Sequence, residues 1–277
     1  MTDQNSERVY SSKIIKASGL LADTKTLFAH WDESKSDAEN LQAARRTNIF
    51  GKASRSRVED ILTIFRQRYI PQNGSGRILR RLVRSDLSAE VVDRVLYYYA
   101  AQADPLIYDF VTKYLYDLHQ RGRHVITVED AFDFLDQVTS ARPTTPWSEA
   151  TRERVAQHLL ATLRDFRVLQ AARGSPRKTF TPVHLPIGAF LYIAFDIRCE
   201  VTSGERLLRH PHWRLFLLNV DTVERLFIEA HQLGYLRYEA AGSIVRIEFA
   251  YNDLAALVET IIERAQMWNR QENDWLN

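Results

Sequence analysis

The chain has 277 residues, of which 45% are hydrophobic and 26% are charged, and its formal net charge is +2. This composition is typical of globular proteins and excludes a disordered, collagenous or repeat-dominated chain. The length allows one large domain or two smaller ones.

The first half of the sequence predicts helices. Apolar residues recur at helical spacing from Val58 to Tyr69, until Pro71 ends the pattern. Ser36 and Glu39 form a capping box, and Asp104 followed by Pro105 is a typical helix start. Together these signals predict a helix over 24–31 and a helix that begins at residue 36. They also predict helices over 54–70, 77–84, 88–99, 105–120 and 127–140.

Residues 142–147 contain two prolines within four residues, a pattern that cannot continue a helix. This segment is the best linker candidate. It predicts a helical N-terminal domain over 1–141, containing a basic region at 45–84, and a C-terminal domain over 148–277.

In the second half, helices are followed by hairpins. A helix over 148–166 precedes extended arms at 168–172 and 179–183, and a helix over 223–233 precedes alternating apolar and charged residues over 236–249. Further helices are predicted at 187–198, 204–209 and 253–267. A helix followed by a two-stranded hairpin is the order of a winged helix-turn-helix. The expected fold is therefore mainly α: a helical N-terminal domain plus a C-terminal part with two helix–hairpin (winged-helix-like) units.

The charges are unevenly distributed along the chain. Residues 45–84 contain eleven basic and two acidic residues, a net charge of +9, so the remaining chain carries −7. Residues from 179 onward contain nine basic and thirteen acidic residues. We expect the basic region to suit nucleic acid and the acidic C-terminal surface to suit a protein partner.

The sharpest feature is a helix with one face of arginine and one of aliphatic residues. Four arginines share a narrow arc and no acid relieves their repulsion: Arg77, Arg80, Arg81 and Arg84. Arginine suits phosphate oxygens, so a polyanion could occupy this face. The alternative is a helix docked on the chain's own acids, such as Asp130, Asp133 and Asp136.

Two further basic groups could extend a DNA-binding surface. One surrounds the turn at 48–54 and consists of Arg45, Arg46, Lys52, Arg55 and Arg57. The other is the tip of the first hairpin, with Arg173, Arg177 and Lys178. A cationic hairpin tip can reach a DNA backbone or minor groove, although ordinary loops also collect such residues.

Signals for catalysis are weak. The pair His210 and His212 lacks a recognisable third metal ligand, so we expect no metal site, and no phosphate loop or nucleophile elbow predicts a cofactor or an enzyme. The lone Cys199 cannot form an internal disulfide. The polar first eight residues and the absence of an apolar run of about 20 residues predict a cytoplasmic protein that does not enter a membrane.

Three strings of the sequence resemble the BrxA family of the BREX phage-defence systems: residues 10–19, 48–58 and 215–219. The resemblance covers essentially the whole chain, but it fixes no individual contact. It implies a bacterial, non-enzymatic component that binds DNA and works beside a methyltransferase, ATPases and other BREX proteins.

The sequence thus leaves two main hypotheses. In the first, the chain is a non-catalytic component of a phage-defence complex that contacts double-stranded DNA mainly through phosphates. In the second, it is a structural adaptor that binds other BREX proteins, with the arginine face docked on an acidic partner. The same charges would also allow RNA binding.

Overall fold

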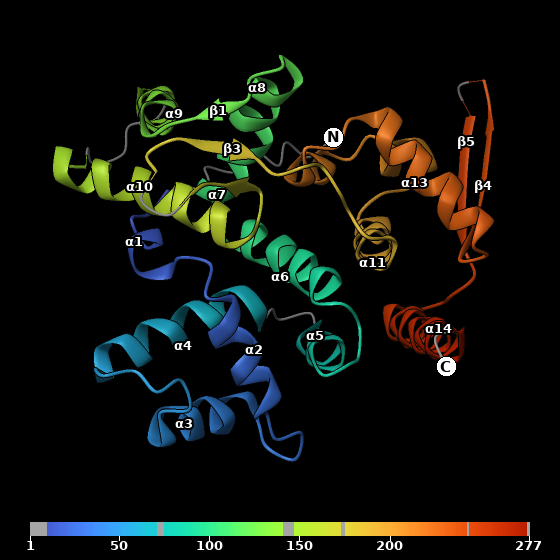
Figure 1. Cartoon of the computed structure of the whole chain (residues 1–277), viewed down its shortest axis with the longest axis horizontal. Helices are drawn as coiled ribbons and strands as arrows, with labels where there is room; N and C mark the ends of the chain where they lie inside the picture. Colours follow the sequence, from blue (N-terminus) through green and yellow to red (C-terminus); the bar gives the residue numbers. More distant parts are fainter. Residues whose placement is uncertain (1–9, 71–74, 141–146, 173–174, 243, 276–277) are drawn as a thin grey trace.

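The computed structural model describes residues 10–70, 75–140, 147–172, 175–242 and 244–275. Helices dominate these residues, as the sequence predicts (Figure 1). The N-terminal helices are α1 (Ile14–Ala17), α2 (Leu21–Ala29), α3 (Asp37–Thr47), α4 (Arg55–Tyr69), α5 (Ser75–Val83) and α6 (Ala89–Ala103). Ser36, Ser54 and Ser88 cap α3, α4 and α6 by accepting hydrogen bonds from backbone N–H groups of the first turn.

The middle of the chain combines helices with three short strands. Its elements are α7 (Pro105–Asp109), the π-helix η1 (Phe110–Leu115), α8 (Tyr116–Gln120), β1 (Val125–Ile126), α9 (Val128–Ser140), α10 (Glu149–Asp165), β2 (Leu169–Gln170) and β3 (Lys178–Phe180). The predicted helix over 105–120 therefore runs through α7, η1 and α8.

The C-terminal part holds the second hairpin between helices. Its elements are α11 (Ile187–Arg198), α12 (Gly204–Leu208), the 3-10 helix η2 (Pro211–Phe216), α13 (Val220–Gln232), β4 (Leu236–Ala241), β5 (Ile244–Phe249) and α14 (Leu254–Trp275). Gly204 approaches the hairpin so closely that a Cβ there would lie 2.5 Å from the carbonyl oxygen of Val245. Only glycine allows α12 to pack on β5 in this way.

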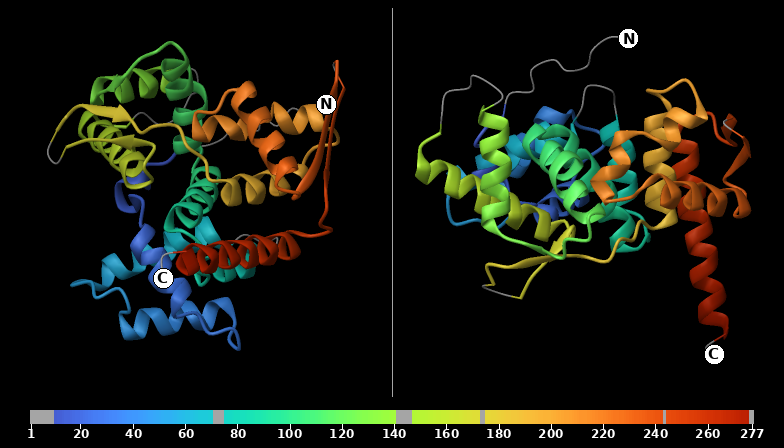
Figure 2. Two further views of the ribbon diagram at one scale, coloured as in Figure 1. Left: turned by 45° about the vertical axis from the view of Figure 1, so that its right-hand side comes forward. Right: turned by 90° about the horizontal axis from the view of Figure 1, so that it is seen from above.

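Helix α6 lies at the centre of the molecule, and nearly all of its residues from Val91 to Ala101 are buried. It contacts α4 and α5 on one side and α11 on another. Figure 1 shows α2–α5 below α6, α7–α10 with the three-stranded sheet above it, and α11–α14 to its right. The long α14 extends beyond the hairpin and lies beside α5 (Figure 2).

Both predicted helix–hairpin units are present, and the first has a third strand. β1 precedes α9 and pairs antiparallel with β3, so the sheet order is β1-β3-β2. β4 and β5 form a separate two-stranded sheet after α13.

The sheet and the packing of α9 on α10 join the residue ranges before and after the proline-rich segment. One buried core includes residues from both ranges. Residues 142–146 of that segment lie outside the described part of the chain.

Candidate nucleic-acid interface

The arginine face of α5 points toward the chain's own acids and carbonyls. The guanidinium of Arg80 donates from Nε and Nη2 to the two carboxylate oxygens of Glu33, at 2.9 and 3.1 Å, and lies 5.2 Å from the ring centre of Trp31. Its side chain is only 11% exposed. Because the guanidinium of Arg80 is nearly buried and forms two hydrogen bonds with one carboxylate, it stabilises the packing of α5 against the segment that connects α2 and α3.

The next two arginines of this face are also engaged. Arg81 makes a bidentate ion pair with Glu259 of α14, with both bonds at 2.6 Å, and this carboxylate raises the pKa of Arg81. Arg84 donates to the carbonyl oxygen of Phe28 at 3.0 Å and to those of Ala29 and Trp31 at the end of α2. Arg77 is exposed. The acids that receive this face are Glu33 and Glu259, not the aspartates of α9 that the sequence suggested.

The turn between α3 and α4 presents a different basic cluster. A hollow of about 490 Å³ is lined by four basic side chains and one acid, together with the cap Ser54; the charged residues are Arg45, Arg46, Lys52, Arg55 and Glu59. Arg45 pairs with Glu59 at 2.6 Å, and Lys52 with Asp23 at 2.8 Å. Arg46 and Arg55 are exposed. We call this the α3–α4 hollow.

A second basic hollow, of about 630 Å³, begins at the first turn of α4 and runs along the helix from Arg57 to Gln67. Its charged lining residues are Lys13, Lys16, Arg57, Asp60 and Arg154, and we call it the α1–α10 hollow. Arg57 donates to the carbonyl oxygen of Lys16 at 2.6 Å, and Lys16 pairs with Asp60 at 3.1 Å. Burial lowers the pKa of His158 nearby, and the positive charges of Arg154 and Arg57 lower it further.

Sequence reasoning missed Lys13, Lys16 and Arg154 as members of a basic surface. They come from α10 and from the region of α1, more than 130 residues apart in the chain. Only the packing of α1 against both α4 and α10 brings them together. Arg154 lies on the predicted helix over 148–166, a position that many basic residues share, and the sequence predicts no element at Lys13 and Lys16.

The tip of the first hairpin is partly described. Arg173 lies outside the described residues, and Arg177 is exposed beside β3. Lys178 begins β3 and is half-buried; burial lowers the pKa of its ammonium, and the charge of Arg164 on α10 adds to this. The hairpin therefore carries positive charge close to the C-terminal end of α10.

The second hairpin has a different surface. Its exposed charges pair along each strand, Arg237 with Glu239 and Arg246 with Glu248. Ile244 near its tip is 71% exposed. This surface offers paired charges and apolar contact rather than unpaired cations.

The structure places a carboxylate, a third potential metal ligand, beside the histidine pair. The sequence did not predict this neighbour. Ligand atoms of Glu200, His210 and His212 all lie within 4.8 Å of one another. Burial lowers the pKa of His210 to about 4, so its ring is neutral at physiological pH. Both rings already serve the fold: His210 Nδ1 accepts the backbone N–H of His212 at 3.4 Å, and the ring of His212 bonds the hydroxyl of Tyr98 at 3.3 Å.

Comparison with known proteins supplies the family. The BrxA family matches residues 8–196, which is more than half of the chain. The chain belongs to the BrxA family. Members of this family are components of BREX phage-defence systems, so the resemblance to the family is confirmed. The match includes the strings at 10–19 and 48–58, whereas the string at 215–219 lies beyond the matched residues. No curated protein matches the chain.

A solved structure supports the fold of this BrxA-family protein. An uncharacterized protein from Magnetospirillum magneticum has 17% sequence identity and a TM-score of 0.57, and the match covers 75% of this chain and 97% of that one. At this identity the likeness concerns the fold alone. Within the described residues, no helix combines the length and hydrophobicity that crossing a bilayer requires.

Proposed function

We propose that this BrxA-family protein is a non-catalytic, cytoplasmic component of its phage-defence system that binds double-stranded DNA mainly through phosphates. The observation that carries the proposal is the pair of basic hollows that share the first turn of α4. Eight basic and two acidic side chains line them. Arg55 lines one hollow and Arg57 the other, so the first turn of α4 links them.

The chemistry of this surface suits a phosphate backbone. Arginine guanidinium groups bond phosphate oxygens in a bidentate manner, and the N-terminus of the 15-residue α4 adds partial positive charge. Phosphate contacts position a protein on DNA without reading its sequence. We therefore propose weakly sequence-specific binding through Arg45, Arg46, Lys52, Arg55 and Arg57, extended by Lys13, Lys16 and Arg154.

The first helix–hairpin unit contributes to the same proposal. Its order, with β1 before α9 and α10 and the hairpin β2–β3 after them, is that of a winged helix-turn-helix. Arg173, Arg177 and Lys178 would place positive charge on its wing. α1 packs on α10 and occupies part of its surface, so phosphate contact at the edge of α10, through Arg154, is favoured over base reading along the whole helix.

The arginine face of α5 has a smaller part in the proposed interface. Arg80 and Arg84 hold α5 against α2 and Glu33, and DNA would have to displace these bonds to reach them. Arg77 and the half-exposed Arg81 remain accessible to a polyanion.

A mobility-shift assay with a generic DNA duplex tests the proposal. The double variant Arg46→Gln/Arg55→Gln removes two exposed charges of the α3–α4 hollow, and we expect about tenfold weaker binding. The matched control Arg225→Gln/Arg237→Gln removes the same charge from α13 and β4, on the other side of the molecule in Figure 1, and should bind like the unchanged protein. Equal loss in both variants, or no loss in either, would overturn the assignment. A competing structured RNA that displaces the duplex would assign the surface to RNA.

A second candidate function is that of an adaptor for other BREX proteins, such as the methyltransferase and ATPase components. The observation that favours it is the surface of α13 and the second hairpin, where Ile228, Leu233 and Ile244 are 38%, 45% and 71% exposed. Asp221 and Glu229 are exposed acids on the same helix, α13. Pull-down of BREX partners that survives the α3–α4 changes but not Ile228→Ser/Ile244→Ser would assign the partner surface there.

A further inference from the structure

The two strands of the second hairpin differ in what lies beside their outer edges. α12 covers the edge of β5, because Gly204 approaches the carbonyl oxygen of Val245 so closely that no further strand can pair there. β4 packs on β5 and on α13, and Figure 1 shows it at the outer limit of the molecule. Its last three residues, 239–241, are exposed. The outer edge of β4 is therefore open.

The contacts of the hairpin show which backbone groups of β4 point away from β5. The carbonyl oxygen of Leu236 lies 3.3 Å from Nδ1 of His231 on α13, so it points outward. The carbonyl oxygen of Val245, which pairs with Ala240, points toward α12. Since backbone groups of antiparallel strands alternate in direction, the N–H and C=O groups of Tyr238 and Ala240 also point outward. No hydrogen bond within the described part of the chain uses these outward groups.

The edge of β4 lacks the usual protection of edge strands. Proteins prevent such edges from pairing with bulges, prolines or lysines. β4 contains neither proline nor lysine, and its register with β5 runs unbroken from Leu236 to Ala241. Its two charged side chains have opposite signs and are 65% and 45% exposed, Arg237 and Glu239. A strand with the opposite order of charges would therefore be attracted to this edge.

We propose that β4 pairs antiparallel with β4 of a second copy of this chain, which joins the two hairpins into one continuous sheet. The twofold axis would lie at Tyr238, opposite the partner's Tyr238. Leu236 would lie opposite the partner's Ala240. Each of these pairs would exchange both of its N–H···O bonds, because all of these residues direct their backbone groups outward.

The two charges select this register. With the axis at Tyr238, Arg237 lies opposite the partner's Glu239, and Glu239 lies opposite the partner's Arg237. The neighbouring registers that also align the outward groups have their axes at Arg237 or at Glu239. They would place two arginines or two glutamates directly opposite each other, which destabilises a sheet. The edge is thus complementary to itself, as a twofold interface requires.

The proposed interface is small and lies away from the basic hollows. Strand pairing over six residues buries much less surface than a permanent dimer does, so we expect a dissociation constant on the order of 10–100 µM. In Figure 1, β4 lies on the opposite side of the molecule from α3 and α4. A dimer would therefore leave the α3–α4 hollow of each copy open.

Sedimentation velocity between about 1 and 200 µM tests the proposal. We expect the unchanged protein to shift from monomer to dimer across this range. Glu239→Arg would place two arginines opposite each other and should weaken the dimer at least tenfold. Arg237→Glu/Glu239→Arg restores opposite charges in the same register and should restore the dimer.

The matched control is Glu248→Arg. It makes the same charge change on the same exposed face of the hairpin, but on β5. Each single variant removes one opposite-charge pair between β4 and β5, Glu239 with Arg246 or Arg237 with Glu248. Glu248→Arg should therefore dimerise like the unchanged protein. Equal weakening in Glu239→Arg and in Glu248→Arg, or failure of the charge swap to restore the dimer, would overturn the proposal.

A backbone variant tests the strand pairing itself. Ala240→Pro removes an outward N–H that β5 does not use, so the hairpin should keep its circular dichroism while the dimer is lost. Dimerisation of a folded Ala240→Pro would overturn the proposal. A chain that stays monomeric up to 200 µM, while Ala240→Pro abolishes capture of another BREX protein, would also overturn it and assign the edge to a strand of that protein.

Discussion

The face of α5 and the turn between α3 and α4 are both rich in arginine, yet they meet different surroundings. On α5, Arg80 and Arg81 each form a bidentate pair with a carboxylate, and Arg84 bonds three backbone carbonyls. At the turn, Arg46 and Arg55 are exposed and line an open hollow.

The difference shows that clustered charge along a sequence does not by itself define a binding surface. The acids that receive the α5 arginines, Glu33 and Glu259, are 47 and 178 residues away from their partners. Conversely, the α1–α10 hollow gains Arg154 from a helix that follows α4 by some eighty residues. What separates the two regions is tertiary packing.

The largest difference between the two regions should be in how much their arginines contribute to the free energy of unfolding. Arg80→Gln removes a nearly buried guanidinium, its two bonds to Glu33 and its contact with Trp31, so we expect a loss of about 2 kcal/mol in the free energy of unfolding. Urea denaturation followed by circular dichroism measures this loss. The exposed neighbour Arg77→Gln is the control and should change stability by less than about 0.5 kcal/mol. Equal stability of the two variants would show that the arginine face is not structural.

Acid should weaken the fold through His210. Burial lowers the pKa of His210 from 6.5 to about 4. The unfolded chain therefore takes up a proton below about pH 6.5 that the folded chain refuses, and stability falls as the pH drops from there toward 4. The loss attributable to His210 should approach about 2 kcal/mol near pH 4.5.

Unfolding curves between pH 7.5 and 4.5 measure this dependence. His210→Asn, which can still accept the backbone N–H of His212, should show a shallower decline. A decline as steep as that of the unchanged protein would assign the acid sensitivity to other groups.

The α1–α10 hollow should affect DNA binding without affecting stability. Lys13→Gln/Arg154→Gln removes two exposed charges, and we expect duplex affinity to fall about fivefold, or about 1 kcal/mol. Fluorescence anisotropy with a labelled duplex measures this change. Unaltered affinity would confine the interface to the α3–α4 hollow.

The smallest effect concerns the pair between α5 and α14. Arg81 and Glu259 are each 46% exposed, so their pair contributes little despite its bidentate geometry. We expect Glu259→Gln to reduce stability by about 0.5 kcal/mol in low salt and by less in high salt. The same variant frees Arg81 and should strengthen duplex binding slightly in the same anisotropy assay. Weaker binding would place Glu259 among the groups that support the interface.

Much of the fold follows from local signals in the sequence. The serine caps, the Asp104–Pro105 start and the alternation in the second hairpin each depend on neighbouring residues, and the corresponding elements lie where they are predicted. The strand β1 has only two residues and no local signal, because its partner β3 follows 52 residues later. The sequence also predicts that the arginines of α5 share one face of the helix, but it does not predict which groups these arginines contact.

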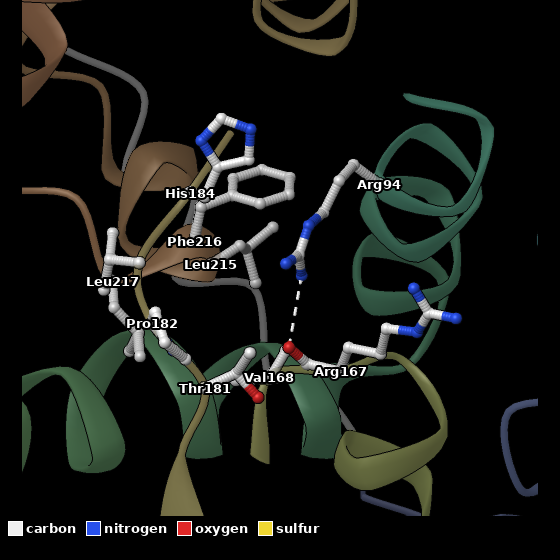
Figure 3. Close-up of a pocket in the computed structure, with 10 residues that line it drawn as sticks. Arg94, Arg167, Val168, Thr181, Pro182, His184, Leu215, Phe216 and Leu217 are labelled. Carbon is white, nitrogen blue, oxygen red and sulfur yellow. Dashed lines mark hydrogen bonds between the residues drawn. The ribbon is translucent and has the colours of Figure 1, made fainter. Parts of the chain in front are cut away.

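The candidate site is less predictable for the same reason. The sequence places Arg45, Arg46, Lys52, Arg55 and Arg57 in one basic group because they are neighbours along the chain. It cannot place Lys13 or Arg154 beside them, since that depends on how α1 packs between α4 and α10. A small hollow lined by Arg94 and by residues 167–168, 181–184 and 215–217 is likewise formed by four distant segments (Figure 3).

The most direct test of the central claim is the salt dependence of duplex binding for two charge-matched variants. Each phosphate contact contributes about −0.9 to the slope of log affinity against log salt concentration. Arg46→Gln/Arg55→Gln should make that slope less negative by about 1.8 if both side chains contact phosphates, whereas Arg77→Gln/Arg81→Gln should change it much less. A slope that changes only in Arg77→Gln/Arg81→Gln would contradict the account. It would show that DNA binds the arginine face of α5 instead.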